Sequence, residues 1–182
     1  GAVDIKHGRK IRMYTLNKIK SAYNESKIGT LPNQKIRKLA SLPTINFEGI
    51  RTYVLDTLKA DLNPNLTYHS ITHTINVEKA VSKYSKLEGI SAKELILLRT
   101  AALFHDTGFL TDYQQNEAFA VNFLRSIAPQ YGYTTEDVHF MSDIILATSK
   151  NVSPSNLFEQ IICDADHDYL GRKDYHLTAA NL

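Results

Sequence analysis

The strongest constraint on the fold is an apolar stretch that ends in two ionisable residues, RTAALFHDTGF at residues 99–109. Its first part has the composition of a buried helix, and Gly108 marks the place where that helix breaks. His105 and Asp106 stand at the end of the apolar segment, where burying an imidazole or a carboxylate is costly unless another group pairs with it. The stretch therefore predicts a core helix whose end carries a polar site.

Two other stretches also place ionisable groups beside apolar helical sequence. One is YHSITHT at residues 68–74, which holds His69 and His73, and the other is IICDADHDYLG at residues 161–171, which holds three aspartates. Histidine is the commonest metal-binding side chain, and carboxylate oxygens bind hard cations. A His from one helix, the His-Asp pair from a second and an Asp from a third can surround one divalent ion, as ligands on separate helices of a bundle do.

Apolar residues recur at three- and four-residue spacing through most of residues 46–182, which is the period of amphipathic α-helices. Strand signals are sparse, because no alternating run is bounded by a hairpin turn. Ser91 with Glu94 fits a capping box, and Thr134 or Thr135 fits a helix N-cap. The pattern predicts an all-α helical bundle with a metal site between core helices. The expected helices span residues 47–62, 71–87, 91–105, 116–128, 135–147 and 157–170.

The charge is divided unevenly along the chain. Residues 1–45 carry a net charge of +8 and residues 46–182 a net charge of −6, within a total of +2. We predict a basic N-terminal arm or linker over residues 1–45, with a short helix at residues 8–23, and one compact domain over residues 46–182. The arm either binds nucleic acid or an acidic partner, or is a solvated extension. No aromatic-plus-Gly recognition pattern accompanies the charge, which favours the extension.

Two features of the composition bear on the cellular setting. Cys163 is the single cysteine, which excludes an internal disulfide framework and predicts a reducing, cytoplasmic compartment. No apolar run reaches the ~18 residues of a membrane span, so a membrane is not an expected partner.

The ordered set of polar stretches resembles the HD-domain metal-dependent phosphohydrolase superfamily over roughly residues 47–175. The residues that carry the resemblance are YHSITHT at 68–74, LFHDTG at 103–108, IILAT at 144–148 and DADHDYLG at 164–171. It implies an all-α, HD-domain-like helical bundle with a metal site between core helices. It also implies that the chain continues, since relatives usually extend beyond the position of Leu182. By this likeness the metal ligands are His73, His105, Asp106 and Asp166.

The resemblance also implies a function. Many relatives hydrolyse phosphate esters or nucleotides with a metal-activated water, so the expected partners are a small, nucleotide-like phosphorylated substrate and one divalent ion: Mn, Mg, Fe, Co, Ni or Zn. The expected catalytic residues are Asp106, Glu117 as proton acceptor, His69 as an orienting or phosphate-binding group, and Arg172 as a charge that neutralises phosphate. The alternative is a catalytically degenerate regulatory module that binds a metal or nucleotide.

The sequence departs from that family pattern at two positions. Many relatives have His-Glu where this chain has Asn116-Glu117, and some binuclear relatives have His where this chain has Lys150. Both differences predict one metal ion instead of two. Asp164 and Asp168 share a helix face that Asp166 does not, so periodicity alone cannot choose the ligand. Asp164 is expected to hold a ligand histidine in place.

Overall fold

The structure is a computed structural model that describes residues 2–4, 10–12, 44–173, 175 and 176. The chain separates into two compact units, Gly1–Pro43 and Thr44–Leu182. In the first unit, strand β1 (Ala2–Asp4) pairs antiparallel with β2 (Lys10–Arg12), with Val3 opposite Ile11.

The helix predicted over residues 8–23 is wrong at residues 10–12, which lie in β2. The backbone there pairs with a separate segment, and a pattern read within one segment does not reveal such a pairing. Residues 13–23 of that expected helix lie outside the described part of the chain.

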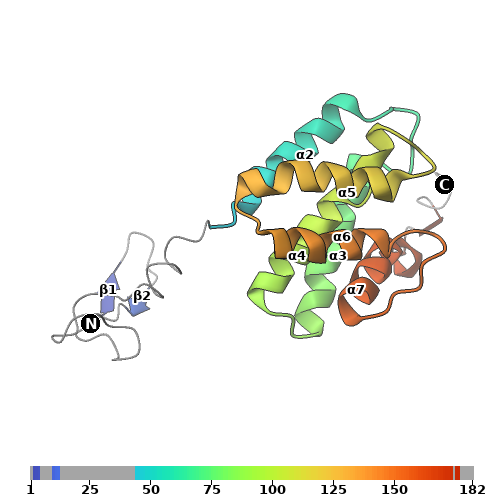
Figure 1. Ribbon diagram of the computed structural model, residues 1–182. Helices are drawn as coiled ribbons and strands as arrows, with labels where there is room; N and C mark the ends of the chain where they lie inside the picture. The colour runs from blue at the N-terminus through green and yellow to red at the C-terminus, as the bar shows by residue number, and fades with distance from the viewer. Residues whose placement is uncertain (1, 5–9, 13–43, 174, 177–182) are drawn as a thin grey trace. The chain divides into compact units, whose positions relative to one another are not determined.

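The second unit confirms the all-α prediction over residues 44–173, where helices are joined by turns and loops (Figure 1). None of the described helices is long and apolar enough to cross a membrane. The α-helices are α2 (Phe47–Asp61), α3 (Ile71–Leu87), α4 (Ala92–Phe104), α5 (Asn116–Ile127), α6 (Thr135–Leu146) and α7 (Leu157–Asp166). The 3₁₀ turns are η2 (Thr107–Leu110), η3 (Ala128–Tyr131) and η4 (Asp168–Gly171).

Helix α4 forms the centre of this bundle, because it packs against α2, α3, α5, α6 and α7. The predicted capping box starts it: Ser91 Oγ accepts from the Glu94 N–H at 3.3 Å, and the Ser91 N–H donates to Glu94 Oε2 at 3.1 Å. Its last turn, from Ala101 to Phe104, is fully buried. A helix that is apolar all round belongs in a core, and this one carries His105 and Asp106 directly at its end.

The last helix ends earlier than predicted, at Asp166 instead of residue 170. His167 is the C-cap of this helix, and its Nδ1 donates to the Cys163 carbonyl at 2.9 Å. The 3₁₀ turn η4 follows. In η4 the Asp168 carboxylate accepts from the Tyr84 hydroxyl on α3 at 2.6 Å. This contact comes from a residue distant in sequence, so the periodicity of residues 157–170 does not reveal it.

A buried carboxylate joins three of the helices. Glu78 on α3 is 4% exposed and accepts from Arg51 Nε on α2 at 2.9 Å. Its other oxygen accepts from Arg99 on α4 at 2.6 Å, and the Arg99 guanidinium also lies 4.1 Å from the centre of the Phe47 ring. The carboxylate is therefore paired on both oxygens, which satisfies the requirement for burying a charge.

Replacing Glu78 with glutamine is expected to lower the free energy of unfolding by about 2 kcal/mol, because two partly buried guanidinium groups lose their counter-charge. Urea unfolding followed by circular dichroism measures the change. Glu88→Gln is the matched control, since Glu88 is exposed and forms no ion pair in the described residues. Equal stability of the two variants would contradict the role assigned to Glu78.

Candidate metal centre

The structure brings the four predicted ligands together from three helices. His73 lies in the first turn of α3, where the Ser70 hydroxyl accepts from the His73 N–H at 3.3 Å and starts the helix. His105 and Asp106 follow α4, and Asp166 is the last residue of α7. His73, His105 and Asp106 are buried, and Asp166 is half-buried.

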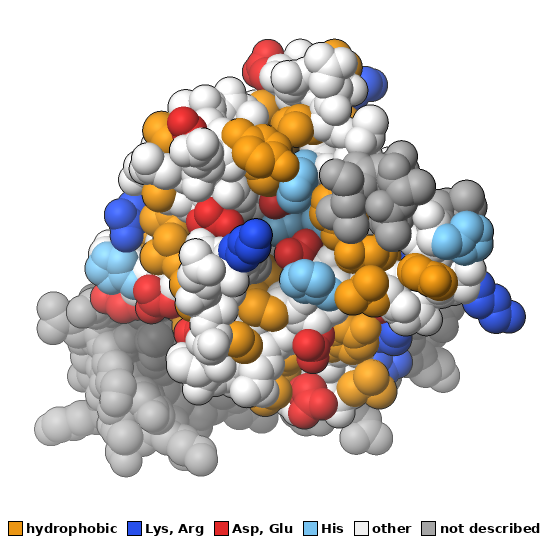
Figure 2. Space-filling view, turned by 90° about the vertical axis from the view of Figure 1, so that its right-hand side faces the viewer, with side chains coloured by type: hydrophobic (Ala, Val, Ile, Leu, Met, Phe, Trp, Pro, Cys, Tyr) orange, Lys and Arg blue, Asp and Glu red, His pale blue; other side chains and the backbone are white. Residues whose placement is uncertain are grey.

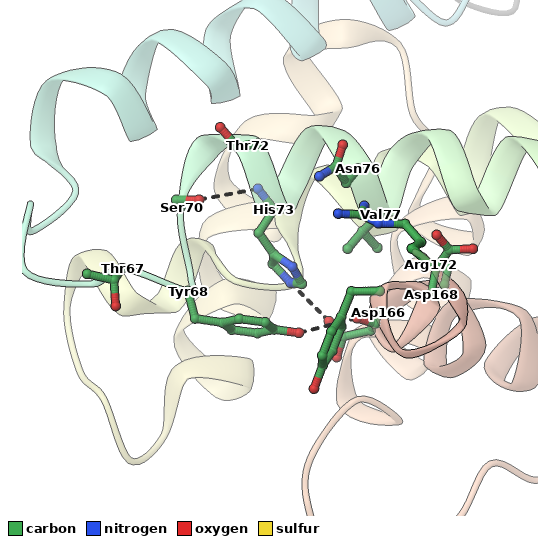
Figure 3. A pocket seen from close by; sticks show the side chains of 12 residues that line it. Thr67, Tyr68, Ser70, Thr72, His73, Asn76, Val77, Asp166, Asp168 and Arg172 are labelled. Atoms are coloured by element: carbon green, nitrogen blue, oxygen red, sulfur yellow. Dashed lines mark hydrogen bonds and ion pairs between the residues drawn. The ribbon is translucent and has the colours of Figure 1, made fainter. Parts of the chain in front are cut away.

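The ligand atoms face one another at close range. His73 Nε2 lies 3.0 Å from Asp166 Oδ1 and 3.3 Å from both His105 Nε2 and Asp106 Oδ2. His105 Nε2 lies 3.2 Å from Asp106 Oδ2 and 3.6 Å from Asp166 Oδ1. Ligands about 2.1 Å from one ion stand roughly 3.0 Å apart at adjacent octahedral positions and roughly 3.4 Å apart at tetrahedral ones. Three of these donors, on His73, His105 and Asp166, lie close enough together to hold one divalent ion, and Asp106 faces both histidine nitrogens (Figure 3 shows His73 and Asp166 converging).

A backbone contact fixes which nitrogen of His105 is available. His105 Nδ1 lies 2.8 Å from the Ala102 carbonyl oxygen, which can only accept, so Nδ1 carries the hydrogen. In the neutral ring the Nε2 lone pair then points at the other donors. The expectation that Asp164 holds a ligand histidine is wrong: Asp164 is exposed, and a main-chain carbonyl holds His105 instead.

In the absence of a metal ion, attraction between the histidines and the ionised carboxylates stabilises this cluster. Burial favours the neutral form of His105, but the carboxylates of Asp106 and Asp166 outweigh burial and raise its pKa well above the ordinary value. Burial also opposes the charge on Asp106 and Asp166, yet the neighbouring histidines lower the pKa of both carboxyl groups. The metal-free cluster is thus a set of ionised carboxylates around a protonated imidazole.

His69 lies beside the four donors and contacts one of them. Its Nδ1 is 3.1 Å from Asp106 Oδ2, and its ring stacks on Phe109 with 4.1 Å between the centroids. Two overlapping groups have donor atoms close enough for one ion: His69, His73 and Asp106, and His73, His105 and Asp166. Because an ionised carboxylate accepts, the contact with Asp106 places the hydrogen on Nδ1, which suits an orienting residue better than a ligand.

Tyr68 contacts the site, although the sequence assigned it no role. Its ring centroid is 4.6 Å from that of His73, and its hydroxyl lies 3.5 Å from the Asp166 carbonyl oxygen. Burial and the nearby Asp166 charge raise its pKa, so it remains a neutral phenol. In the sequence it is the first residue of the YHSITHT stretch, but its contact with α7 comes from the tertiary fold.

Two hollows open beside the cluster, and Asp166 lines both. The larger one, here called the metal-side hollow, has a volume of about 710 Å³ and includes His69, Asp106 and Glu117. The smaller one has a volume of about 380 Å³ and is lined by His73 and Arg172 (Figure 3). Glu117 and Arg172, both predicted to be catalytic, therefore lie in different hollows. On one face of the molecule, histidine and carboxylate side chains gather in a depression with a Lys or Arg side chain beside them (Figure 2).

Asn116 lines the metal-side hollow, and Gly108 packs against the Asn116 backbone. A Cβ atom on Gly108 would stand 1.7 Å from the Asn116 carbonyl oxygen, so only glycine allows the start of α5 to pack this closely on η2. Asn116 is buried, and with its amide nitrogen turned toward Glu117 it donates to that carboxylate at 2.8 Å. The packing thereby holds Asn116 and Glu117 in the same hollow as Asp106.

Comparison of this chain with protein-family models, with curated proteins and with solved structures gives no match. The resemblance to the HD-domain superfamily therefore rests on the residues of this chain alone.

Proposed function

We propose that this chain is a metal-dependent phosphohydrolase that acts on a phosphate ester or nucleotide. One observation carries the proposal: Nε2 of His73 and Nε2 of His105 each lie 3.0–3.6 Å from carboxylate oxygens of both Asp106 and Asp166, beside an open hollow. Such a donor set suits a first-row divalent ion, and its identity is left open among Mn, Mg, Fe, Co, Ni and Zn. A divalent ion supplies Lewis acidity and lowers the pKa of bound water.

The residues of the chain have separate tasks in this proposal. His73, His105, Asp106 and Asp166 hold the ion. His69 holds the Asp106 carboxylate through Nδ1, which leaves Nε2 to exchange a proton with a ligand in the metal-side hollow.

Two further residues act on the substrate side of the site. The Glu117 carboxylate lines the metal-side hollow and is placed to accept a proton from water there. Arg172 lines the smaller hollow, so in this proposal it contacts the substrate only where the substrate extends past Asp166.

A metal screen tests the function. Protein stripped with EDTA is loaded with each of the six ions, and phosphate release is measured from a phosphomonoester, a phosphodiester and several nucleotides. The proposal expects release only with metal, and none from a His73→Ala variant purified in parallel, which excludes a contaminating phosphatase. Metal binding without release from any substrate would favour the regulatory module instead.

The ionisation of the cluster predicts how pH affects the metal-free protein. The lowered pKa values of Asp106 and Asp166 stabilise the fold above about pH 4, and this contribution is lost as pH falls through their folded values. The raised pKa of His105 stabilises the fold below about pH 6.5, and this contribution is lost as pH rises through its folded value.

Thermal unfolding in EDTA from pH 4 to 9 is therefore expected to show a decline on the alkaline side that a His105→Gln variant lacks. Added divalent metal should reverse the decline, because it binds the native state. Parallel profiles for the wild type and His105→Gln would contradict this assignment.

A further inference from the structure

The metal-side hollow is rich in carboxylates but contains one Lys or Arg side chain among its described lining residues. The carboxylates are Asp106, Glu117 and Asp166, and the cation is Lys150. A divalent ion bound by two carboxylates and two neutral imidazoles forms a centre with no net charge. Glu117 then leaves the hollow negative, so a phosphate is repelled unless Lys150 supplies the compensating charge.

Lys150 is held on a hydrogen-bonded turn that follows α6. The Thr148 N–H donates to the Ile145 carbonyl at 3.1 Å, and the Val152 N–H donates to the Ser149 carbonyl at 2.9 Å. Cys163 Sγ donates to the Ala147 carbonyl at 3.3 Å and links this turn to α7, the helix that carries Asp166. The turn is therefore fixed next to the metal ligands.

The ammonium group of Lys150 has no partner in the described part of the chain. Lys93 and Lys83, by comparison, lie 2.8 Å from Asp137 and 3.5 Å from Asp168. Lys150 is exposed and forms no such ion pair with any residue that the structure describes, although three carboxylates line the same hollow. A positive charge presented to a cavity without a protein counter-charge is available to an anionic ligand.

We propose that Lys150 is a substrate-binding catalytic residue that contacts the non-bridging oxygens of the phosphate held at the metal centre. This inference rests on the proposed function. Lys150 supplies the positive charge that one metal ion, neutralised by its own ligands, does not supply. Its ammonium offsets the negative charge on the phosphoryl oxygens.

Binding of inorganic phosphate to the metal-loaded protein, measured by calorimetry, tests the inference. The variants are Lys150→Met, which removes the charge, and Lys150→Arg, which keeps it. Lys79→Met is the control, because Lys79 is exposed on α3 and lines neither hollow. We expect Lys150→Met to weaken phosphate binding by about 10- to 100-fold, with metal affinity unchanged. Lys150→Arg and Lys79→Met should stay within about threefold of the wild type.

The outcomes separate this inference from the proposed function. Phosphate binding by Lys150→Met that equals the wild type overturns the inference, even if the protein hydrolyses esters. Phosphate binding that depends on Lys150 in a protein that hydrolyses no ester supports the anion site and counts against the phosphohydrolase. A folded wild type that binds metal but no phosphate overturns the inference.

Discussion

Replacing Asp106 with alanine should remove the bound metal and all measurable hydrolysis while the helical bundle stays folded. Asp106 Oδ2 lies 3.1–3.3 Å from nitrogens of His69, His73 and His105, so the carboxylate contacts every histidine of the site. Loss of a residue that merely orients a ligand costs 10- to 100-fold in metal affinity, and loss of a ligand should cost more than about 100-fold.

Metal content after dialysis, circular dichroism and phosphate release measure this result. Asp164→Ala is the matched control, because Asp164 is an exposed aspartate of α7 that forms no hydrogen bond to the site histidines. It should keep both metal and activity. An Asp106→Ala protein that retains one metal ion per chain would show that the ion binds elsewhere.

Replacing Gly108 with alanine should produce the largest loss of stability of any single methyl group added to this fold. The new Cβ atom would stand 1.7 Å from the Asn116 carbonyl oxygen and 2.4 Å from its carbonyl carbon. These are backbone atoms, so no side-chain rotation relieves the overlap, and η2 and α5 must move apart. Overpacking typically costs 1–3 kcal/mol, and a backbone overlap of this size should cost about 3 kcal/mol or more.

Gly171→Ala provides the control for this prediction, since a Cβ atom there meets nothing within 4 Å. Urea unfolding should give Gly171→Ala a stability within about 1 kcal/mol of the wild type. The Gly108 variant should also lose activity, because the start of α5 carries Asn116 and Glu117 into the metal-side hollow. Equal stabilities for the two variants would contradict the close packing of η2 on α5.

The sequence was sufficient to predict the helices because their ends carry local signals. Residues 71–87 match α3 at both ends, and the Ser91–Glu94 capping box is present as expected. The end of α7 was predicted wrongly because the signal is not local. Tyr84 bonds Asp168 across the interface between α3 and η4, and an apolar period cannot distinguish the last turn of an α-helix from a 3₁₀ turn.

The site was predictable only in part for a related reason. Periodicity left Asp164, Asp166 and Asp168 open, and the family resemblance selected Asp166, which the structure brings to 3.0 Å from His73. The separation of Glu117 and Arg172 into two hollows depends on how α5 and η4 pack, and neither local sequence contains that information. The network of Glu78 was missed because Arg51 and Arg99 lie 27 and 21 residues away.

The central claim is that one divalent ion is bound by His73, His105, Asp106 and Asp166. Anomalous diffraction from crystals grown with Mn, Co or Zn, with data collected on both sides of the absorption edge of that metal, tests it most directly. We expect one peak among the two Nε2 atoms and the two carboxylates, about 2.0–2.2 Å from each ligand atom. A metal-loaded crystal with no peak among these four side chains, or with two fully occupied ions there, would contradict it.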